Sequence, residues 1–470
     1  MNQKMVGSKR KAKTTIQVNK RAKQASTPGV KPEESVASAG VKIQLNERPT
    51  KSASIEQGNV EAEVKLGANG SDNITGLNTV ACETKLNNKN GGEEVQVKKT
   101  STRKTKNAKN VEPIAERTTA TKHRIGAHVS SAGGVHNAPV NLIFIGGNAF
   151  ALFLKNHKKW ASPDLDPEHA RLFTEGCKSN NIHVGDCCLP HGSYLVNLAH
   201  PDPERKKQAY SSFLNDLCRC HKLGIRLYNF HPGNANATTR EEGIRLIAEN
   251  INKAHGNPAT GEVITVLETM ASLGNTIGGT FADLAAIIEL VNDKSRIGVC
   301  LDTCHVFAAG YDLRTAEAYA HTMQKFDKEI GLEYLLAFHI NDSKAPFSSY
   351  RDLHARIGTG YLGLRAFHNI MNDVRFHGLP MILETPVSVI GEDGKKFEDK
   401  SIWAREIKML EKLVGMDTKS DEFKELEANL QKEGEGERER IGSQVERRQV
   451  RNATTKKKRG KTKGESIEPE

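Results

Sequence analysis

The stretch Ile297-Gly-Val-Cys-Leu-Asp-Thr-Cys-His305 has a pattern that recurs along the chain. Its first five residues are apolar or small, which is typical of a strand buried on both faces, and a carboxylate and an imidazole follow. Similar apolar runs lie between Arg124 and Met416, and helix-like stretches such as 204–223 and 281–292 separate most of them. The other runs are Ile125–Val129, Ala149–Leu154, Cys187–His191, Leu227–His231, Val263–Glu268, Leu335–Ile340 and Met381–Glu384.

The alternation of these runs with helices predicts a parallel sheet, because parallel strands need long crossover connections. Eight such units favour a closed barrel over an open doubly wound sheet. We therefore predict an α/β fold with a single (β/α)8 TIM barrel over residues 124–416. Residues 1–120 are polar and lack apolar periodicity, which predicts a disordered basic arm. Residues 417–470 are predicted to be a charged basic tail, disordered or partly helical.

Charge and composition limit the class of protein. The chain has 68 Lys and Arg against 57 Asp and Glu, and its net charge of +11 favours polyanionic partners such as nucleic acid. No apolar run reaches the roughly 18 residues of a membrane span, and the N-terminus lacks the apolar core of a secretory signal, so we expect an intracellular protein without membrane contact. The eight cysteines include no C-x-x-C pair and are predicted to be reduced and mostly buried.

Histidines and carboxylates stand where most of the apolar runs end, or in the loops that follow. Any one of them is more often a hydrogen-bonded strand end than a ligand, but the carboxyl ends of barrel strands meet on one rim. Imidazole and carboxylate without thiolate predict catalytic zinc, manganese or iron, and the set is large enough for two or three ions. The candidates are His191, His231, Glu268, Asp302, His305, His339, Asp352, His354 and Glu384.

The charge of such a site predicts its substrate class. Three divalent cations would exceed the carboxylates of this set by about two positive charges. That surplus favours a phosphate or phosphodiester, whose negative charge grows in the transition state, and predicts metal-assisted phosphoryl hydrolysis. Two nearby stretches give weaker indications. Gly126–Gly134 fits either a phosphate contact or a tight turn, and Lys155–Trp160, with cations beside an aromatic ring, favours DNA contact.

Seven ordered motifs lie between Arg124 and Met416. They are Leu189-Pro-His-Gly-Ser-Tyr-Leu195, Asn229-Phe-His-Pro-Gly233, Leu267-Glu-Thr269, Cys300-Leu-Asp-Thr-Cys-His305, Phe338-His-Ile-Asn-Asp342, Asp352-Leu-His354 and Leu383-Glu-Thr385. Together they resemble the endonuclease IV family of apurinic/apyrimidinic (abasic-site) endonucleases. The resemblance implies a base excision repair enzyme with three zinc ions. Such an enzyme cleaves DNA 5′ to an abasic site, leaving a 3′-hydroxyl and a 5′-deoxyribose phosphate, and also removes blocked 3′ ends.

The resemblance also implies a role for each candidate ligand. The first zinc group would be His191, His231 and Glu268; the second Glu268, Asp302, His339 and Glu384; the third His305, Asp352 and His354. Glu268, which two groups share, would orient the attacking hydroxide as the catalytic residue.

The partner that the resemblance implies is double-stranded DNA with abasic sites or blocked 3′ ends, and we expect a monomer to bind it. Tyr194 and Leu195 match family positions that enter the duplex where the damaged nucleotide is flipped out, although packing at a helix start is the alternative. Asn156, Lys158 and Lys159 are further candidates for DNA contact. The two lysines stand where bacterial relatives more often have Arg and Gln, which leaves phosphate attraction but not bidentate contact.

Basic clusters at both ends lie outside this resemblance. Lys9–Lys13 followed by Lys20–Lys23 has the form of a bipartite nuclear import signal, and Lys456–Arg459 is a second basic cluster. We therefore expect the nuclear import machinery as a partner and the nucleus as the location. A mitochondrial presequence is the alternative for the N-terminus.

Two other functions fit part of the pattern. A sugar isomerase or epimerase holds one or two cations with Glu, Asp and His on a similar barrel, but would need neither the group of His305, Asp352 and His354 nor basic ends. A non-catalytic chromatin or damaged-DNA binding module would depend on the basic arms, and the complete set of ligand residues counts against it.

Overall fold

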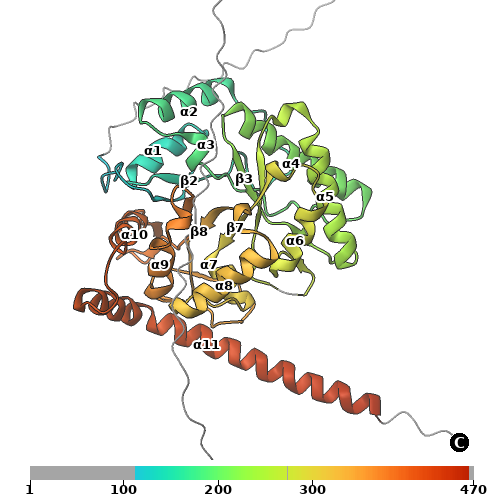
Figure 1. The fold of residues 1–470 in the computed structure, drawn as a ribbon, viewed down its shortest axis with the longest axis vertical. Helices are drawn as coiled ribbons and strands as arrows, with labels where there is room; N and C mark the ends of the chain where they lie inside the picture. The colour runs from blue at the N-terminus through green and yellow to red at the C-terminus, as the bar shows by residue number, and fades with distance from the viewer. Residues whose placement is uncertain (1–111, 273, 465–470) are drawn as a thin grey trace, which may run out of the picture. The chain divides into compact units, whose positions relative to one another are not determined.

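The structure is a computed structural model that describes residues 112–272 and 274–464. At its centre is a seven-stranded sheet in the order β2-β1-β11-β8-β7-β5-β3, in which every pair of neighbours is parallel. The strands are β1 Arg124–His128, β2 Ala149–Ala151, β3 Leu227–Phe230, β5 Ile264–Glu268, β7 Ile297–Asp302, β8 Leu335–His339 and β11 Pro380–Leu383. Each corresponds to one of the apolar runs, and the sheet is the framework of the barrel (Figure 1).

The remaining apolar run joins the two edges of this sheet. Phe150 of β2 forms a parallel bridge with Cys188, and His191 forms one with Asn229 of β3. The backbone N–H of Asn229 donates to the carbonyl oxygen of Pro190 at 2.9 Å. The segment does not form a regular strand because Pro190 has no N–H to donate. The predicted (β/α)8 barrel is therefore confirmed, and residues 188–191 close it.

Helices cover the outside of the barrel (Figure 1). The predicted helix at 204–223 is α4, which begins where the Asp202 carboxylate accepts a hydrogen bond from Arg205 N at 3.0 Å. The helices are α1 Asn137–Phe144, α2 Pro167–Ser179, α3 Val184–Cys187, α4 Pro203–Lys222, α5 Arg240–His255, α6 Phe281–Leu290, α7 Thr303–Ala309, α8 Ala316–Glu329, α9 Leu364–Met371, α10 Ser401–Lys412 and α11 Asp421–Gly464. Short 3-10 turns at Pro258–Thr260, Lys294–Arg296, Leu332–Tyr334 and Val374–Phe376 precede β5, β7, β8 and β11.

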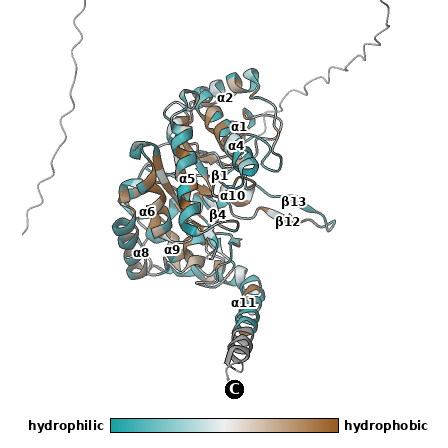
Figure 2. Ribbon diagram, turned by 90° about the vertical axis from the view of Figure 1, so that its right-hand side faces the viewer, coloured by the Kyte–Doolittle hydropathy of each residue, from teal (hydrophilic) through white to brown (hydrophobic). Residues whose placement is uncertain are grey.

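Three small ribbons extend from the rim where the barrel strands end. They are β4 Gly233–Asn234 with β6 Thr276–Ile277, β9 Asp342–Ser343 with β10 His354–Ala355, and β12 Ser388–Ile390 with β13 Lys396–Glu398. The first strands of these ribbons follow β3, β8 and β11, so all three lie at the carboxyl ends of barrel strands. The β12–β13 ribbon projects from the body of the protein in Figure 2.

The packed part of the chain is longer than 124–416. Ile114 N donates to Phe144 O at 2.8 Å and Arg117 Nη1 donates to Asn180 O at 2.7 Å, so residues 112–120 lie against the barrel rather than in the predicted arm. In the predicted tail the helical alternative holds, because Asp421–Gly464 forms α11, and Phe423 of that helix is fully buried. The rest of the predicted arm, 1–111, and the last residues, 465–470, lie outside the described residues.

The described part of the chain contains neither a disulfide nor a helix suited to cross a membrane. Its seven cysteines are free thiols, and all but Cys218 are buried; Cys82 lies outside the described residues. None of the helices described in the structure combines the length and apolar character needed to cross a membrane.

Candidate metal centre

The predicted ligands lie together at the carboxyl ends of the barrel strands. Glu268, Asp302 and His339 are the last residues of β5, β7 and β8, and all three are completely buried. His231 and Glu384 directly follow β3 and β11. The remaining four are His191 at the end of the closing segment, His305 in the first turn of α7, Asp352 in the loop between β9 and β10, and His354 as the first residue of β10.

Ligand atoms of these residues form three adjoining groups. Within each group the candidate nitrogen and oxygen atoms all lie within 4.8 Å of one another. The groups are His191, His231 and Glu268; Glu268, Asp302, His339 and Glu384; and His305, Asp352 and His354. The structure thus brings together all nine residues that the sequence pattern predicted, in the same three sets that the resemblance implied.

The Glu268 carboxylate lies between the groups. Its Oε2 is 3.1 Å from Nε2 of His191 and 3.5 Å from Nε2 of His231. Its Oε1 is 3.2 Å from Nδ1 of His339 and 3.4 Å from Nδ1 of His305. One carboxylate that faces ligands on both sides is suited to bridge two cations.

Imidazole nitrogens in this centre face carboxylates in positions that fit bound cations. Nε2 of His305 and of His354 lie 3.2 Å and 3.1 Å from Oδ1 of Asp352, and neither contact has hydrogen-bond geometry. In His339 it is Nδ1 that faces the carboxylates, 3.2 Å from Oε1 of Glu268 and 3.3 Å from Oε2 of Glu384. In His305 the other ring nitrogen, Nδ1, lies 2.8 Å from the carbonyl oxygen of Thr269, and in His191 Nδ1 lies 2.7 Å from Gly192 O. A hydrogen bond from Nδ1–H to a carbonyl leaves Nε2 without a proton, which is the tautomer that binds a metal ion.

Three polar residues that contact the ligands were missed in the sequence. Asn229 Nδ2 donates to Glu268 Oε2 at 2.6 Å, and Asn341 Nδ2 donates to Asp302 Oδ2 at 2.7 Å. Nδ1 of His128, at the end of β1, lies 3.2 Å from Oε1 of Glu384. The signal was present, because Asn229 and Asn341 each stand two positions from a predicted histidine ligand, the spacing that brings strand residues to one face.

The facing charges shift the pKa values of the centre. Burial alone would raise the pKa of Glu268, but the facing histidines, His339 foremost, outweigh burial and hold it well below its usual range. Burial alone would lower the pKa of His354, but the Asp352 carboxylate 3.1 Å away and the neighbouring Asp302 and Glu384 outweigh burial and raise the pKa to about 9. Without cations, Glu268 is thus ionised and His354 is protonated at neutral pH.

Metal binding at this centre is expected to release protons, because an imidazole must lose its proton to become a ligand. With a pKa of about 9, His354 alone should give up about one proton when the metal-free protein binds zinc near neutral pH. The affinity of the group of His305, Asp352 and His354 should therefore rise as the pH is raised toward 9. Calorimetric titration with zinc in two buffers of different ionisation enthalpy counts the protons. Equal heats in both buffers would contradict protonation of His354.

Cys304 is a neighbour of the centre that we did not predict to have a chemical role. Its Sγ lies within 4.8 Å of ligand atoms of Asp302 and His354. Complete burial raises the pKa of the Cys304 thiol well above its usual range, so the thiolate form that metals prefer is disfavoured.

Tyr194 and Leu195 lie at the open side of the centre. Their exposed fractions are 56% and 40%. The ring centroid of Tyr194 is 5.1 Å from that of His191 and 5.2 Å from that of His231. A ligand that approached His191 and His231 from this side would therefore contact Tyr194.

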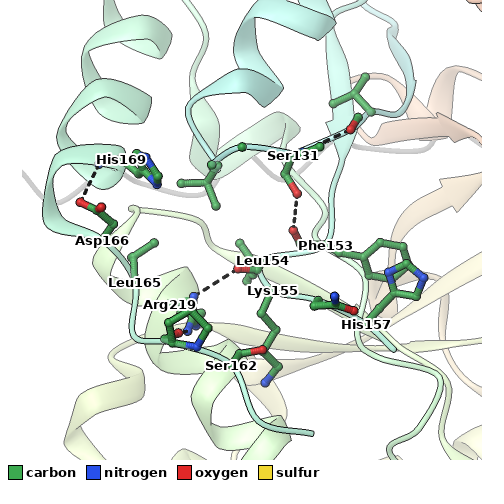
Figure 3. Close-up of a pocket in the computed structure, with 18 of the residues that line it drawn as sticks. Ser131, Phe153, Leu154, Lys155, His157, Ser162, Leu165, Asp166, His169 and Arg219 are labelled. Atoms are coloured by element: carbon green, nitrogen blue, oxygen red, sulfur yellow. Dashed lines mark hydrogen bonds between the residues drawn. The ribbon is translucent and has the colours of Figure 1, made fainter. Parts of the chain in front are cut away.

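A cavity of about 1350 Å³ adjoins the centre, and Asn156, Lys158 and Lys159 line part of it. Figure 3 shows another part of the lining, with Phe153, Lys155 and His157. Asn156 Oδ1 accepts a hydrogen bond from Lys158 N at 2.9 Å, so this side chain shapes the loop. The side chains of Lys158 and Lys159 are exposed. A buried ion pair holds the start of the loop against helix α4, because Lys155 Nζ lies 3.2 Å from Oδ1 of Asp216 in that helix.

The glycines of Gly126–Gly134 stand where the backbone turns sharply or where another strand approaches closely. Gly133 and Gly134 also line the cavity. Gly133 and Gly134 have φ angles of 85° and 137°, which other residues rarely adopt, and a Cβ at Gly126 would overlap the backbone of Ala149. The tight-turn interpretation therefore accounts for Gly133 and Gly134, whereas Gly126 lies within β1, where the close approach of β2 requires glycine.

Comparison with known proteins agrees with this geometry. The model of the xylose isomerase-like TIM barrel family matches residues 144–413. The chain is 42% identical over 314 residues to apurinic-apyrimidinic endonuclease 1 of Schizosaccharomyces pombe, covering 67% of this chain and 88% of that protein. It is 47% identical to the probable endonuclease 4 of Campylobacter curvus, covering 62% of this chain and 97% of that protein. A crystal structure of endonuclease IV from Thermus thermophilus superposes with a TM-score of 0.52 at 28% identity, covering 62% of this chain and 99% of that one. The chain belongs to the endonuclease IV family of apurinic/apyrimidinic endonucleases.

Proposed function

We propose that this protein is a zinc-dependent DNA repair endonuclease that hydrolyses the phosphodiester 5′ to an abasic site, leaving a 3′-hydroxyl and a 5′-deoxyribose phosphate. Removal of blocked 3′ ends in base excision repair would use the same site. The observation that carries the proposal is the meeting of nine histidine and carboxylate ligands in three adjoining groups, beside the exposed Tyr194.

The chemistry of the ligands favours three zinc ions. Imidazole and carboxylate are the ligands of catalytic zinc sites, and such sites keep a coordination position open for water or substrate. The group of His191, His231 and Glu268 and the group of His305, Asp352 and His354 each offer three protein ligands, which leaves that position open. Bound zinc ions would lower the pKa of water and neutralise the charge that develops on the phosphate.

Glu268 would act in this site as an ionised base and orienting group. Its low pKa keeps it a carboxylate, so that it can accept a hydrogen bond from an attacking water but cannot donate a proton to a leaving group. The hydrogen bond from Asn229 at 2.6 Å holds its Oε2 in place. Asn341 likewise holds Asp302 in place by a hydrogen bond from its Nδ2, and its Oδ1 accepts a hydrogen bond from the backbone N–H of Glu384 at 2.9 Å.

The exposed side chains beside the centre would recognise the lesion. An abasic site lacks the stacking of one base, and an aromatic or aliphatic side chain that enters the duplex compensates for that loss. Tyr194 and Leu195 are exposed next to His191, where a flipped nucleotide would meet the centre. Asn156, Lys158 and Lys159 would contact the phosphates of the same duplex.

Replacing Tyr194 by Ala is expected to lower kcat/KM for incision at an abasic site about tenfold, because a base–aromatic contact is worth roughly 1–3 kcal/mol. Its zinc content should not change, since Tyr194 is not among the ligands. Tyr194→Phe is the matched control, which keeps the ring and should retain most of the activity. Incision kinetics of the two variants on one duplex measure this. Equal losses in both variants would assign the effect to the hydroxyl group and contradict insertion of the ring.

The partners and location of the protein follow from its charge. We propose a monomer that binds duplex DNA and is carried to the nucleus by the import machinery, with mitochondria as a further location. The basic clusters at Lys9–Lys13 and Lys20–Lys23 lie outside the described residues, and Lys456–Arg459 falls within α11. Imaging of tagged protein with each cluster replaced by Gln tests their contribution.

The proposal is tested by comparing substrate classes. We expect incision of a duplex with one abasic analogue and no incision of the same undamaged duplex. We also expect that a 3′-blocked primer becomes extendable by a DNA polymerase, and that free ketohexoses are not interconverted. Epimerisation of a sugar without incision of DNA would support the sugar-isomerase alternative, and binding to damaged DNA without incision would support the binding-module alternative.

A further inference from the structure

Helix α11 lies beyond residue 413, where the match to the family model ends. Its N-terminal half nevertheless packs against the barrel domain. Phe423 is fully buried, with its ring centroid 5.6 Å from that of His368 in α9. Further along the helix, Ile441 and Val445 are buried against Ala345. Figure 1 shows the helix passing α9 and continuing beyond the barrel.

The middle of α11 is bonded to the backbone of the loop that follows β10. Gln431 Nε2 donates to Gly358 O at 2.7 Å and to Gly360 O at 3.1 Å. Arg438 Nη1 donates to Thr359 O at 2.6 Å. Three successive carbonyl groups therefore accept hydrogen bonds from one face of the helix, which fixes the path of this loop.

A glycine in α11 allows this close approach. A Cβ added at Gly434 would overlap the carbonyl oxygen of Thr359, so only glycine fits there without displacing the helix. Glycine inside a helix costs about 1 kcal/mol relative to alanine. Gly436, two residues further on, is a useful contrast, because a Cβ there would meet nothing within 4 Å.

The bonded loop in turn holds the ribbon that carries two ligands. The buried Asp342 carboxylate of β9 accepts hydrogen bonds from Gly360 N at 2.9 Å and from Leu362 N at 3.0 Å. Leu353, which stands between the ligands Asp352 and His354, itself packs on the Ile441 and Val445 cluster. Helix α11 therefore contacts the ligand ribbon directly and through this loop.

The ribbon is the part of the centre that most needs such support. The other ligands stand at barrel strand ends or in the helix turn after β7, whereas His354 begins β10, outside the barrel sheet, and Asp352 lies in the loop that joins β9 to β10. The Asp352 side chain is 50% exposed, and the Asp302 and Glu268 side chains are completely buried. The Asp352 carboxylate contacts His305 and His354, which are themselves ligands, so the position of its backbone depends on the packing of the ribbon and its loop.

We infer that α11 is a clamp that positions Asp352 and His354 and so controls how firmly the group of His305, Asp352 and His354 retains its cation. The inference rests on the proposed zinc site. In this arrangement α11 does not touch the substrate. It acts through the ribbon, and its loss weakens one of the three metal groups more than the other two.

The test compares Gly434→Ala with Gly436→Ala in the full-length, zinc-loaded protein. Both changes favour the helix, but only Gly434→Ala pushes it from Thr359. We expect one zinc ion to leave the Gly434→Ala protein about tenfold faster in the presence of a chelator, with the other two retained as in the wild type. Amide hydrogen exchange of residues 343–363 should also be faster. Gly436→Ala should match the wild type in both measurements.

A second variant covers the case in which Gly434→Ala does not fold. The double variant Gln431→Ala, Arg438→Met removes the hydrogen bonds to the loop without a clash, and should release the same zinc ion faster. Zinc release and hydrogen exchange equal to the wild type in every folded variant would overturn the clamp. These readouts do not depend on DNA, so a wild-type protein that binds zinc but fails to incise would count against the proposed function and leave the clamp to be decided by zinc release.

Discussion

Replacing Glu268 by Gln is expected to lower the rate of incision at an abasic site about a hundredfold or more. The carboxylate faces ligands of every group, with its oxygens 3.1 Å from His191 and 3.2 Å from His339. The amide of Gln keeps the size of the side chain but removes its charge, and it offers an N–H where a cation should sit. Both the bridge between cations and the orientation of water are then lost.

The control for this variant is Glu262→Gln. Glu262 is an exposed carboxylate just before β5, the strand that ends at Glu268. The two substitutions therefore make the same chemical change near opposite ends of one strand. Single-turnover incision of one duplex by both proteins, with their zinc contents measured, gives the comparison. A Glu268→Gln protein that keeps more than about a tenth of the wild-type rate would exclude a catalytic role for this carboxylate.

Removal of the metal ions is expected to abolish incision and to lower stability together. An ion present at about 1,000 times its Kd stabilises the folded protein by about 4 kcal/mol, and this contribution disappears on chelation. Part of this loss of folding stability is offset in the metal-free protein. Histidines such as His354 become protonated there and form ion pairs with the neighbouring carboxylates. That compensation is present at neutral pH and is lost as the pH rises through about 9, so the metal-free protein should become less stable in alkaline solution.

Calorimetric unfolding and incision assays on the chelated and the zinc-restored protein measure both effects. Zinc should restore the unfolding temperature and the activity in parallel. Full activity in a protein shown to be free of metal would contradict the central role of the cations. A destabilised protein that regains its stability but not its activity with zinc would place the catalytic residues elsewhere.

Much of the barrel and its centre could be predicted because the pattern is local. An apolar run that ends in His or a carboxylate indicates both a buried strand and the residue at its carboxyl end, which lies on the rim of the barrel. Glu268 and Asp302 were therefore recognisable without knowledge of their neighbours. Closure of the barrel was less evident, since Pro190 interrupts the ladder in the segment that closes it. The orienting residues Asn229 in β3 and Asn341 just after β8 were overlooked, because an amide indicates a contact with a ligand only when its partner on a neighbouring strand is known.

The role of α11 could not be predicted for a different reason. Its buried apolar residues form two short groups, Phe423 with the partly buried Leu426 and Leu430, and Ile441 with Val445. Charged residues surround both groups along the helix, so the sequence resembles a solvated tail. Gly434 indicates a weak helix when it is considered alone. Its contact with Thr359 depends on a loop that lies 75 residues earlier in the chain, and only the fold brings the two together.

The most direct test of the central claim is to incubate the purified protein, without added metal, with a duplex that carries one tetrahydrofuran abasic analogue. The analogue cannot undergo β-elimination, so a new 3′-hydroxyl end can arise only by hydrolysis. We predict a single cut 5′ to the analogue, a 3′ end that a DNA polymerase can extend, and about three zinc ions per chain. A protein that carries its full zinc complement and leaves this duplex intact would contradict the claim that the centre is a DNA repair endonuclease.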